Sequence, residues 1–423
     1  MSVFKVGSNK SSQNNFPSVR PTLDLDFANS KTLDPRITFT RASGGSYVGA
    51  DGLIKLAGVN EPRFDHDPVT GESLGLLVEE AKTNLVTYSE QFDNANWTKS
   101  STTVTANATT APDGTLTADR LLETAVTSSF YVGAFYVTTT PGTYTFSVYA
   151  KGDGSGRLLN MVFYNGFYAQ SYFNLSTGVV SNVDAGLTAS IQSLPNGWFR
   201  CSVTGDYYAF LSILLYSAVA AGESSVYTAR AGSASAGLFL WGCQGEAGAF
   251  PTSYIPTEAS TRTRAADDAQ ITGKNFSSWY NQSEGTIFSQ FYLDSNRTNT
   301  RWVASVGAIS TSGSGNTGFI IGRVAPDYLY AECRVNTTPQ YSATASFPSS
   351  RIAKISYGLK NADQRVAFNG TLASESTGSF APLSQNRMDI GSLLGIEYLC
   401  GTISRLTYYP KRLTDAQLQV LTR

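Results

Sequence analysis

Short runs in which apolar and polar residues alternate, separated by turn-forming residues, recur along most of this 423-residue chain. In the run TYTFSVYA at residues 143–150, the alternation assigns Tyr144, Phe146, Val148 and Ala150 to one face and Thr143, Thr145, Ser147 and Tyr149 to the other. A period of two is that of a half-buried β-strand. Many such runs, bounded by turns such as Asn165-Gly166, Asn196-Gly197 and Asn369-Gly370, predict an all-β chain of tandem sandwich or jelly-roll domains.

Only 15% of the residues are charged, the formal net charge is -1 and the sequence shows no basic stripe, so we expect no nucleic-acid binding. No apolar run reaches the roughly 18 residues of a membrane span, so we expect no membrane insertion. The polar N-terminus lacks the apolar core of a signal peptide. Cys201, Cys243, Cys333 and Cys400 lie far apart, which favours buried thiols over a zinc site or a disulfide framework.

Changes in composition divide the chain into four parts. Residues 1–20, rich in Ser and Asn, are expected to form an arm or tail, and residues 21–86 a small β-rich unit. Residues 87–260 are expected to form a jelly roll and residues 269–423 a second sandwich, with a polar link between them. The second sandwich should end in a helix, since Thr414 and Gln417 have the spacing of a capping box, flanked by Leu413 and Leu418.

Two segments resemble parts of structural proteins of tailed bacteriophages: residues 241–268 (WGCQGEAGAFPTSYIPTEASTRTRAADD) and residues 61–86 (EPRFDHDPVTGESLGLLVEEAKTNLV). The resemblance is to tail-fibre or head-fibre virion proteins. It implies a carbohydrate-binding-module-like jelly roll followed by a concanavalin A/laminin-G-like domain. Pro251 and Pro256, which cannot donate to a strand ladder, and the polar run after them predict that residues 241–268 are a junction rather than a binding site.

The same resemblance implies a location in the virion after assembly in the host cytoplasm. It also implies contacts of the N-terminal segment with other virion proteins, a homotrimer and a possible host-surface glycan. The predicted function is therefore a non-enzymatic tail-fibre or tail-tip adhesion protein. A capsid-decoration or head-fibre protein and a polysaccharide depolymerase stay open as alternatives.

Aromatic residues give the strongest indication of binding, because flat rings stack on the apolar face of a sugar. The candidates are Tyr164, Tyr168 and Tyr172 around the Asn165-Gly166 turn, and Tyr207 further along. The alternative is that these rings fill the sandwich core.

No catalytic residue, metal or cofactor is predicted. The second sandwich lacks the strand of alternating acids that a glycosidase of this class uses. The glycines at 152, 154 and 156 lead into a strand, not into the helix of a phosphate site. Asp65, Asp67 and Glu72 faintly resemble a Ca²⁺ loop, but turn-capping roles for these carboxylates are favoured. The single histidine, His66, is expected in a solvated loop.

Overall fold

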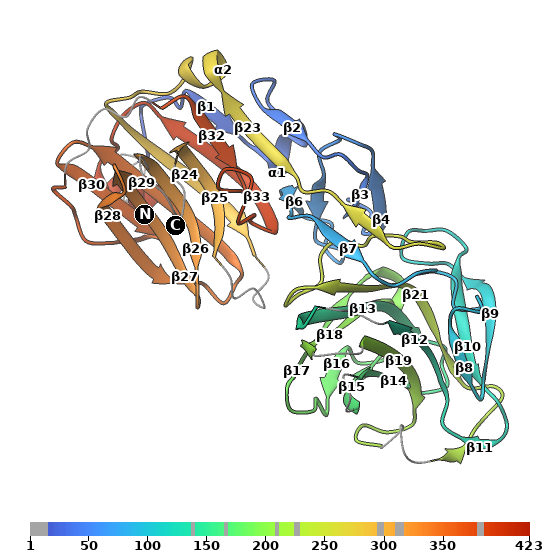
Figure 1. Cartoon of the computed structure of the whole chain (residues 1–423). Helices are drawn as coiled ribbons and strands as arrows, with labels where there is room; N and C mark the ends of the chain where they lie inside the picture. The colour runs from blue at the N-terminus through green and yellow to red at the C-terminus, as the bar shows by residue number, and fades with distance from the viewer. Residues whose placement is uncertain are drawn as a thin grey trace, which may run out of the picture. The chain divides into compact units, whose positions relative to one another are not determined.

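The computed structural model describes residues 16–136, 140–164, 168–207, 211–223, 229–293, 300–308, 317–378 and 385–423. These residues form two compact units of antiparallel sheet. Unit 1 contains residues 16–40, 74–80 and 267–423, and unit 2 contains residues 41–73 and 81–266. Figure 1 shows the consequence for chain order: unit 1 combines the blue strands β1, β2 and β6 with the orange and red strands of the C-terminal third.

Unit 2 is a β-sandwich of two antiparallel sheets. Sheet A has the order β17 (Leu187–Ser193), β18 (Phe199–Tyr207), β13 (Gly142–Gly152), β21 (Gly237–Ala247), β10 (Ala118–Glu123) and β9 (Thr102–Thr109). Sheet B has the order β16 (Val179–Ser181), β15 (Tyr168–Asn174), β14 (Leu158–Tyr164), β19 (Leu211–Ala218), β12 (Tyr131–Tyr136) and β8 (Thr98–Ser100).

The core of unit 2 lies between these sheets and follows the alternation in the sequence. Tyr144, Phe146, Val148 and Ala150 of β13 all belong to it, as predicted. Phe146 meets Phe163 of sheet B edge to face, with ring centroids 5.9 Å apart. Cys201 and Cys243 are buried in the same core as free thiols. Burial raises the pKa of both thiols, so they pack as small apolar side chains.

Short strands complete unit 2. They form the pairs β3 (Gly45–Val48) with β4 (Ile54–Ala57), β7 (Lys82–Asn84) with β22 (Arg262–Arg264), and β11 (Thr127–Ser128) with β20 (Arg230–Ala231); β5 spans Phe64–His66. In the pair β7–β22, the predicted polar link forms a strand beside the segment that leads into the sandwich, and Arg262 lies opposite Asn84. The link is therefore partly strand.

Unit 1 is a second β-sandwich. One sheet has the order β31 (Thr371–Leu372), β30 (Asp363–Phe368), β29 (Ile352–Lys360), β24 (Glu284–Tyr292), β33 (Gly401–Tyr409) and β6 (Ser73–Val78), and β1 (Leu23–Leu25) also pairs with β33. The other has the order β2 (Thr38–Thr40), β23 (Asp268–Thr272), β32 (Arg387–Ile390), β25 (Arg301–Ala308), β26 (Thr317–Val324), β27 (Tyr328–Val335) and β28 (Thr338–Ser346). Phe319 of one sheet packs edge to face on Tyr357 of the other, with centroids 6.1 Å apart.

Helices are short and lie outside the sheets: α1 (Phe27–Ser30), α2 (Gly273–Ser277) and α3 (Asp415–Leu421). The predicted capping box of α3 is confirmed, with reciprocal bonds between Thr414 and Gln417. Leu413 and Leu418 pack in one cluster, as a hydrophobic staple requires. The predicted turn at Asn369-Gly370 is confirmed as well, since both residues have positive φ, 45° and 82°.

Residues 21–86, predicted as one small unit, supply strands to both sandwiches. Leu23 pairs with Tyr408 and Leu76 with Ile403, whereas β3 and β4 lie in unit 2. Residues 1–15 of the predicted arm lie outside the described residues. None of the helices in the described ranges has the length and apolar character needed to cross a membrane.

Candidate functional site

Sheet B of unit 2 carries a second, tyrosine-rich face. In β14, Leu159, Met161 and Phe163 point into the inter-sheet core, so the residues between them project from the opposite face. There Val162, Leu214 and Tyr216 form a separate apolar cluster with Tyr131 packed against it. We call this surface the tyrosine face; it consists of Tyr131, Asn160, Val162, Tyr164, Tyr168, Gln170, Tyr172, Leu214 and Tyr216.

The strand register arranges these side chains in rows across the sheet. One row runs through the partners Tyr131, Tyr216, Asn160 and Tyr172 on four adjacent strands. The rings of Tyr131 and Tyr216 are in contact, with centroids 4.7 Å apart and their planes tilted by 39°. Rings and amides thus alternate along the row, which is the combination that meets the C–H faces and hydroxyls of a sugar.

The middle of the tyrosine face is buried and held by hydrogen bonds. Asn160 Nδ2 donates to Gln170 Oε1 at 2.9 Å, and the Tyr172 hydroxyl donates to the same oxygen at 3.1 Å. The backbone carbonyl of Glu223 is a second acceptor within reach of the same Tyr172 hydroxyl, whose one proton the two acceptors share. Tyr172 and Tyr216 are each only 2% exposed. This part of the face is therefore a rigid support and offers no ring to solvent.

One end of the face is accessible. Tyr164 and Tyr168 are direct partners across β14 and β15, and their ring centroids lie 4.6 Å apart at an interplanar angle of 36°. Tyr164 is half-buried and Tyr168 is 37% exposed. These two adjacent rings make an apolar platform at the end of the tyrosine face, and an exposed aromatic surface of this kind can stack on a sugar ring.

The four tyrosines predicted from the sequence as sugar-binding residues do not all lie on the same surface. Tyr164, Tyr168 and Tyr172 lie on one face, as their grouping around one turn suggested. Tyr207 lies on β18 of sheet A, fully buried in the core, where it meets Tyr144 edge to face at 5.5 Å. Tyr207 is an even number of residues from Cys201 and Val203 on the same strand, so it lies on the same face of β18 as these two core residues.

Sequence reasoning missed Tyr131, Asn160, Gln170 and Tyr216. A signal for them exists: the run LSILLYSA is apolar at both parities, which is typical of a strand covered on both faces. Such a strand predicts a second packed face but does not indicate which residues border it.

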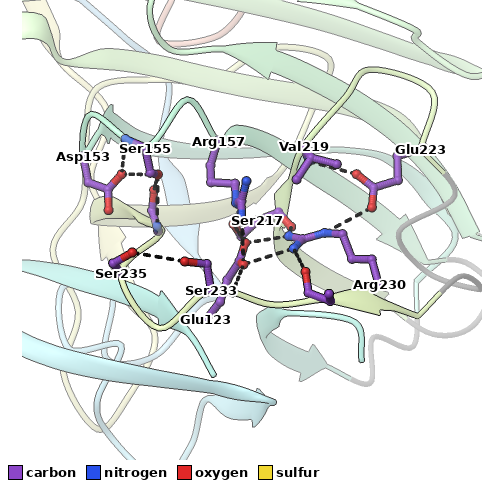
Figure 2. Close-up of polar contacts among 12 residues, drawn as sticks. Glu123, Asp153, Ser155, Arg157, Ser217, Val219, Glu223, Arg230, Ser233 and Ser235 are labelled. Atoms are coloured by element: carbon purple, nitrogen blue, oxygen red, sulfur yellow. Dashed lines mark hydrogen bonds and ion pairs between the residues drawn. The ribbon is translucent and has the colours of Figure 1, made fainter. Parts of the chain in front are cut away.

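Unit 2 also contains a charged cluster in which two arginines bind one glutamate (Figure 2). Arg157 donates twice to the Glu123 carboxylate at 2.7 and 2.9 Å, and Arg230 donates at 2.6 and 3.0 Å. The Ser217 hydroxyl and the Ser233 backbone N–H complete its coordination. Arg230 in turn pairs with Glu223 at 3.1 Å.

The Glu123 side chain has no exposed surface. Burial alone would raise its pKa, but the hydrogen bonds from Arg230 and Arg157 outweigh burial and lower the pKa to about 2. Every oxygen of this carboxylate is engaged within the protein. We therefore assign the Glu123 cluster to the architecture of unit 2 and not to ligand binding.

The weak metal candidates do not form a shared site: Asp65 lies on β5, Asp67 caps a turn, and the Glu72 side chain is exposed. Asp65 accepts the backbone N–H of Val48 at 2.6 Å. Asp67 caps its own turn, accepting from Val69 and Thr70 at 2.9 and 2.8 Å. Partial burial by itself would raise the pKa of Asp67, but the hydrogen bonds from the backbone outweigh burial and lower it. Among the described residues, no three His, Cys, Asp or Glu side chains gather as metal ligands would.

His66 is not in a solvated loop, so that expectation is wrong. It lies on β5 with 5% of its surface exposed, and its Nδ1 is 3.0 Å from the Val48 carbonyl oxygen. Strand β3 packs beside β5, and the Asp residues that flank His66 in the sequence do not reveal this contact.

Comparison with known proteins found no matching family model and no matching curated protein. Solved structures do match. One is a carbohydrate-binding module, the Ruminococcus gnavus IT-sialidase CBM40 bound to alpha2,3 sialyllactose: 18% identity, 33% of this chain, 82% of that chain, TM-score 0.28. NanB sialidase from Streptococcus pneumoniae matches at 15% identity over 32% of this chain and 23% of that one, TM-score 0.27. Trypanosoma rangeli sialidase with sialic acid matches at 8% identity over 72% and 58%, TM-score 0.28. Similarities at this level carry no functional inference.

Proposed function

We propose that this protein is a non-enzymatic structural component of a tailed-phage virion, a tail-fibre or tail-tip adhesion protein that binds host-surface glycan through unit 2. The observation that carries glycan binding is the Tyr164–Tyr168 platform at the accessible end of the tyrosine face. The virion assignment is supported by the phage-like segments at 61–86 and 241–268 and by the two tandem sandwiches.

In this proposal the N-terminal segment attaches the protein to other virion proteins and the assembly is a homotrimer. Unit 2 then supplies weak, Ca²⁺-independent sugar contacts that gain avidity from repetition. Two stacked tyrosines contribute apolar area at low cost in side-chain entropy, and the buried Asn160–Gln170 bond fixes the strands that carry them.

Binding to oligosaccharides released from host capsule and lipopolysaccharide tests the glycan-binding role. The double variant Tyr164→Ala/Tyr168→Ala should lose about tenfold or more in affinity, because both rings that would stack on the sugar are removed. Tyr328→Ala is the matched control, since Tyr328 is 43% exposed but lies in unit 1. Chelator should change nothing. Equal binding by wild type and the double variant would contradict the platform.

Release of new reducing ends from the same polysaccharides, abolished by one Asp or Glu substitution, would show a depolymerase and overturn the non-enzymatic assignment. Electron microscopy of intact particles decides the location. Density for this chain at the tail supports the adhesion role, whereas density on the capsid would replace it with the head-fibre alternative.

A further inference from the structure

Unit 2 contains a polar pocket that is lined in part by residues 256–262, which belong to the segment predicted from the sequence to be a junction. The cavity has a volume of ≈ 430 Å³ and is lined by Glu90, Gln91, Pro256, Thr257, Glu258, Ser260, Thr261 and Arg262. We call it the Arg262 pocket. Its volume falls in the range of small-molecule sites.

The walls of the Arg262 pocket are tied together through the backbone. The turn at residues 88–91 and the segment 256–262 are joined by bonds from Tyr88 N to the Glu258 carbonyl at 2.7 Å and from Ser89 N to the Thr257 carbonyl at 3.2 Å. Thr257 N returns a bond to Ser89 Oγ at 2.9 Å. The far side of the segment is held by β22 on β7. The backbone walls of the pocket are therefore preformed, and only side chains need to be ordered when a ligand enters.

One pocket carboxylate is positioned from beneath. Glu90 Oε1 accepts from the Tyr254 hydroxyl at 2.9 Å, and Ser89 Oγ lies 2.7 Å from the same hydroxyl. Tyr254 itself is buried against Trp241 and Tyr149, with centroids at 4.7 and 5.9 Å. Burial raises the pKa of Glu90, while the Tyr254 bond opposes the rise. A fixed, partly desolvated carboxyl of this kind is suited to accept hydroxyl donors from a ligand.

The remaining polar groups are open. Five of the lining residues are exposed, and across the described ranges their side chains have no hydrogen-bond or ion-pair partner: Gln91, Glu258, Ser260, Thr261 and Arg262. Carboxylate, amide and guanidinium groups each offer two hydrogen-bonding atoms in one plane. Neighbouring hydroxyls on a ring match that geometry.

The charge pattern excludes simple ions. Two carboxylates repel an anion, while Arg262 repels a cation and a third acidic ligand is missing from the lining. An apolar cavity of ≈ 120 Å³ adjoins the pocket and shares Pro256 and Arg262 with it; Leu56, Ala57 and Ile255 supply its apolar lining. A polar wall beside an apolar one fits a ring that has hydroxyls at its edge and C–H groups on its face.

We propose that the Arg262 pocket is a second binding site, specific for a neutral polyhydroxylated ring such as a hexose unit. It is separate from the Tyr164–Tyr168 platform and does not depend on it. Glu90, Glu258 and Arg262 would bind the hydroxyls, and Pro256 would contact the C–H face.

Saturation-transfer NMR on the full chain tests the pocket with glucose, galactose, mannose and N-acetylglucosamine as probes, at concentrations on the order of 1–10 mM. Wild type should transfer saturation to at least one of them. Glu258→Ala and Arg262→Ala should each weaken that sugar about tenfold, because a charge-assisted bond is lost. Glu72→Ala is the matched control, an exposed glutamate of unit 2 outside the pocket.

The Tyr164→Ala/Tyr168→Ala variant should keep this monosaccharide signal, which separates failure of the pocket from failure of the platform. Far-UV circular dichroism checks that each variant is folded. No transfer to any of the four sugars would overturn the proposal, and so would an unchanged signal in both pocket variants. Binding of glucuronic acid in place of every neutral sugar would overturn the assignment of a neutral ligand.

Discussion

The Glu123 cluster and the Arg262 pocket are built from the same residue types in the same unit, yet their charges are used in opposite ways. The Glu123 carboxylate has no exposed surface and is bound by Arg157 and Arg230. Glu258 and Arg262 face solvent, without an ion pair in the described part of the chain. Saturation of a charge by its neighbours, rather than the residue type, thus separates a structural group from one available to a ligand.

The largest expected effect is on the saturated side of this comparison. Glu123→Ala should lower the free energy of unfolding of unit 2 by about 3–5 kcal/mol, because it leaves two mostly buried guanidinium groups without their carboxylate. Urea unfolding followed by tryptophan fluorescence measures this, since Trp97, Trp198 and Trp241 are all buried in unit 2. A loss below about 1 kcal/mol would mean that the cluster contributes no more than a surface pair.

Acid should weaken the same cluster. The pKa of Glu123 is lowered from 4.5 to about 2 by folding, so its contribution is complete above the unfolded value and is lost as pH falls from 4.5 towards 2. The full contribution corresponds to roughly 3 kcal/mol. As the pH is lowered from 4.5 towards 2, the free energy of unfolding should fall less steeply in Glu123→Gln than in wild type. Parallel curves for the two proteins would show that Glu123 is not the group responsible.

The smallest effect belongs to the open side. Glu258→Ala and Arg262→Ala should each change the free energy of unfolding by less than about 0.5 kcal/mol, because exposed, unpaired charges contribute little to stability. The same urea series measures both variants. Destabilisation comparable to that of Glu123→Ala would place these residues in a structural network and remove the contrast between the two regions.

Local features of the fold could be predicted from the sequence. Alternation placed Phe146 and Val148 in the core, and the turn at Asn369-Gly370 and the cap at Thr414 follow from backbone chemistry alone. Each of these depends on neighbours within a few residues. The all-β class follows from the same local patterns summed along the chain.

Pairing between distant segments could not be predicted in this way. Alternation cannot show that Leu23 lies opposite Tyr408, because any exposed strand edge offers the same backbone groups. For the site, clustering around one turn correctly grouped Tyr164 with Tyr168, but the burial of Tyr172 depends on contacts such as that with the Glu223 carbonyl. The Arg262 pocket requires residues 90 and 262 to meet, and no local pattern contains that information.

Unit 1 is completed by strands from opposite ends of the chain: Asp24 accepts a hydrogen bond at 3.0 Å from Thr407, at a sequence separation of 383. During translation, β1, β2 and β6 leave the ribosome long before β33 exists, and most of unit 2, residues 81–266, is made between β6 and β33. Unit 2 can fold while they wait, whereas unit 1 can close only at the end of synthesis. A gene fragment starting at residue 267 would therefore encode an open sheet edge on β33 and not a portable module.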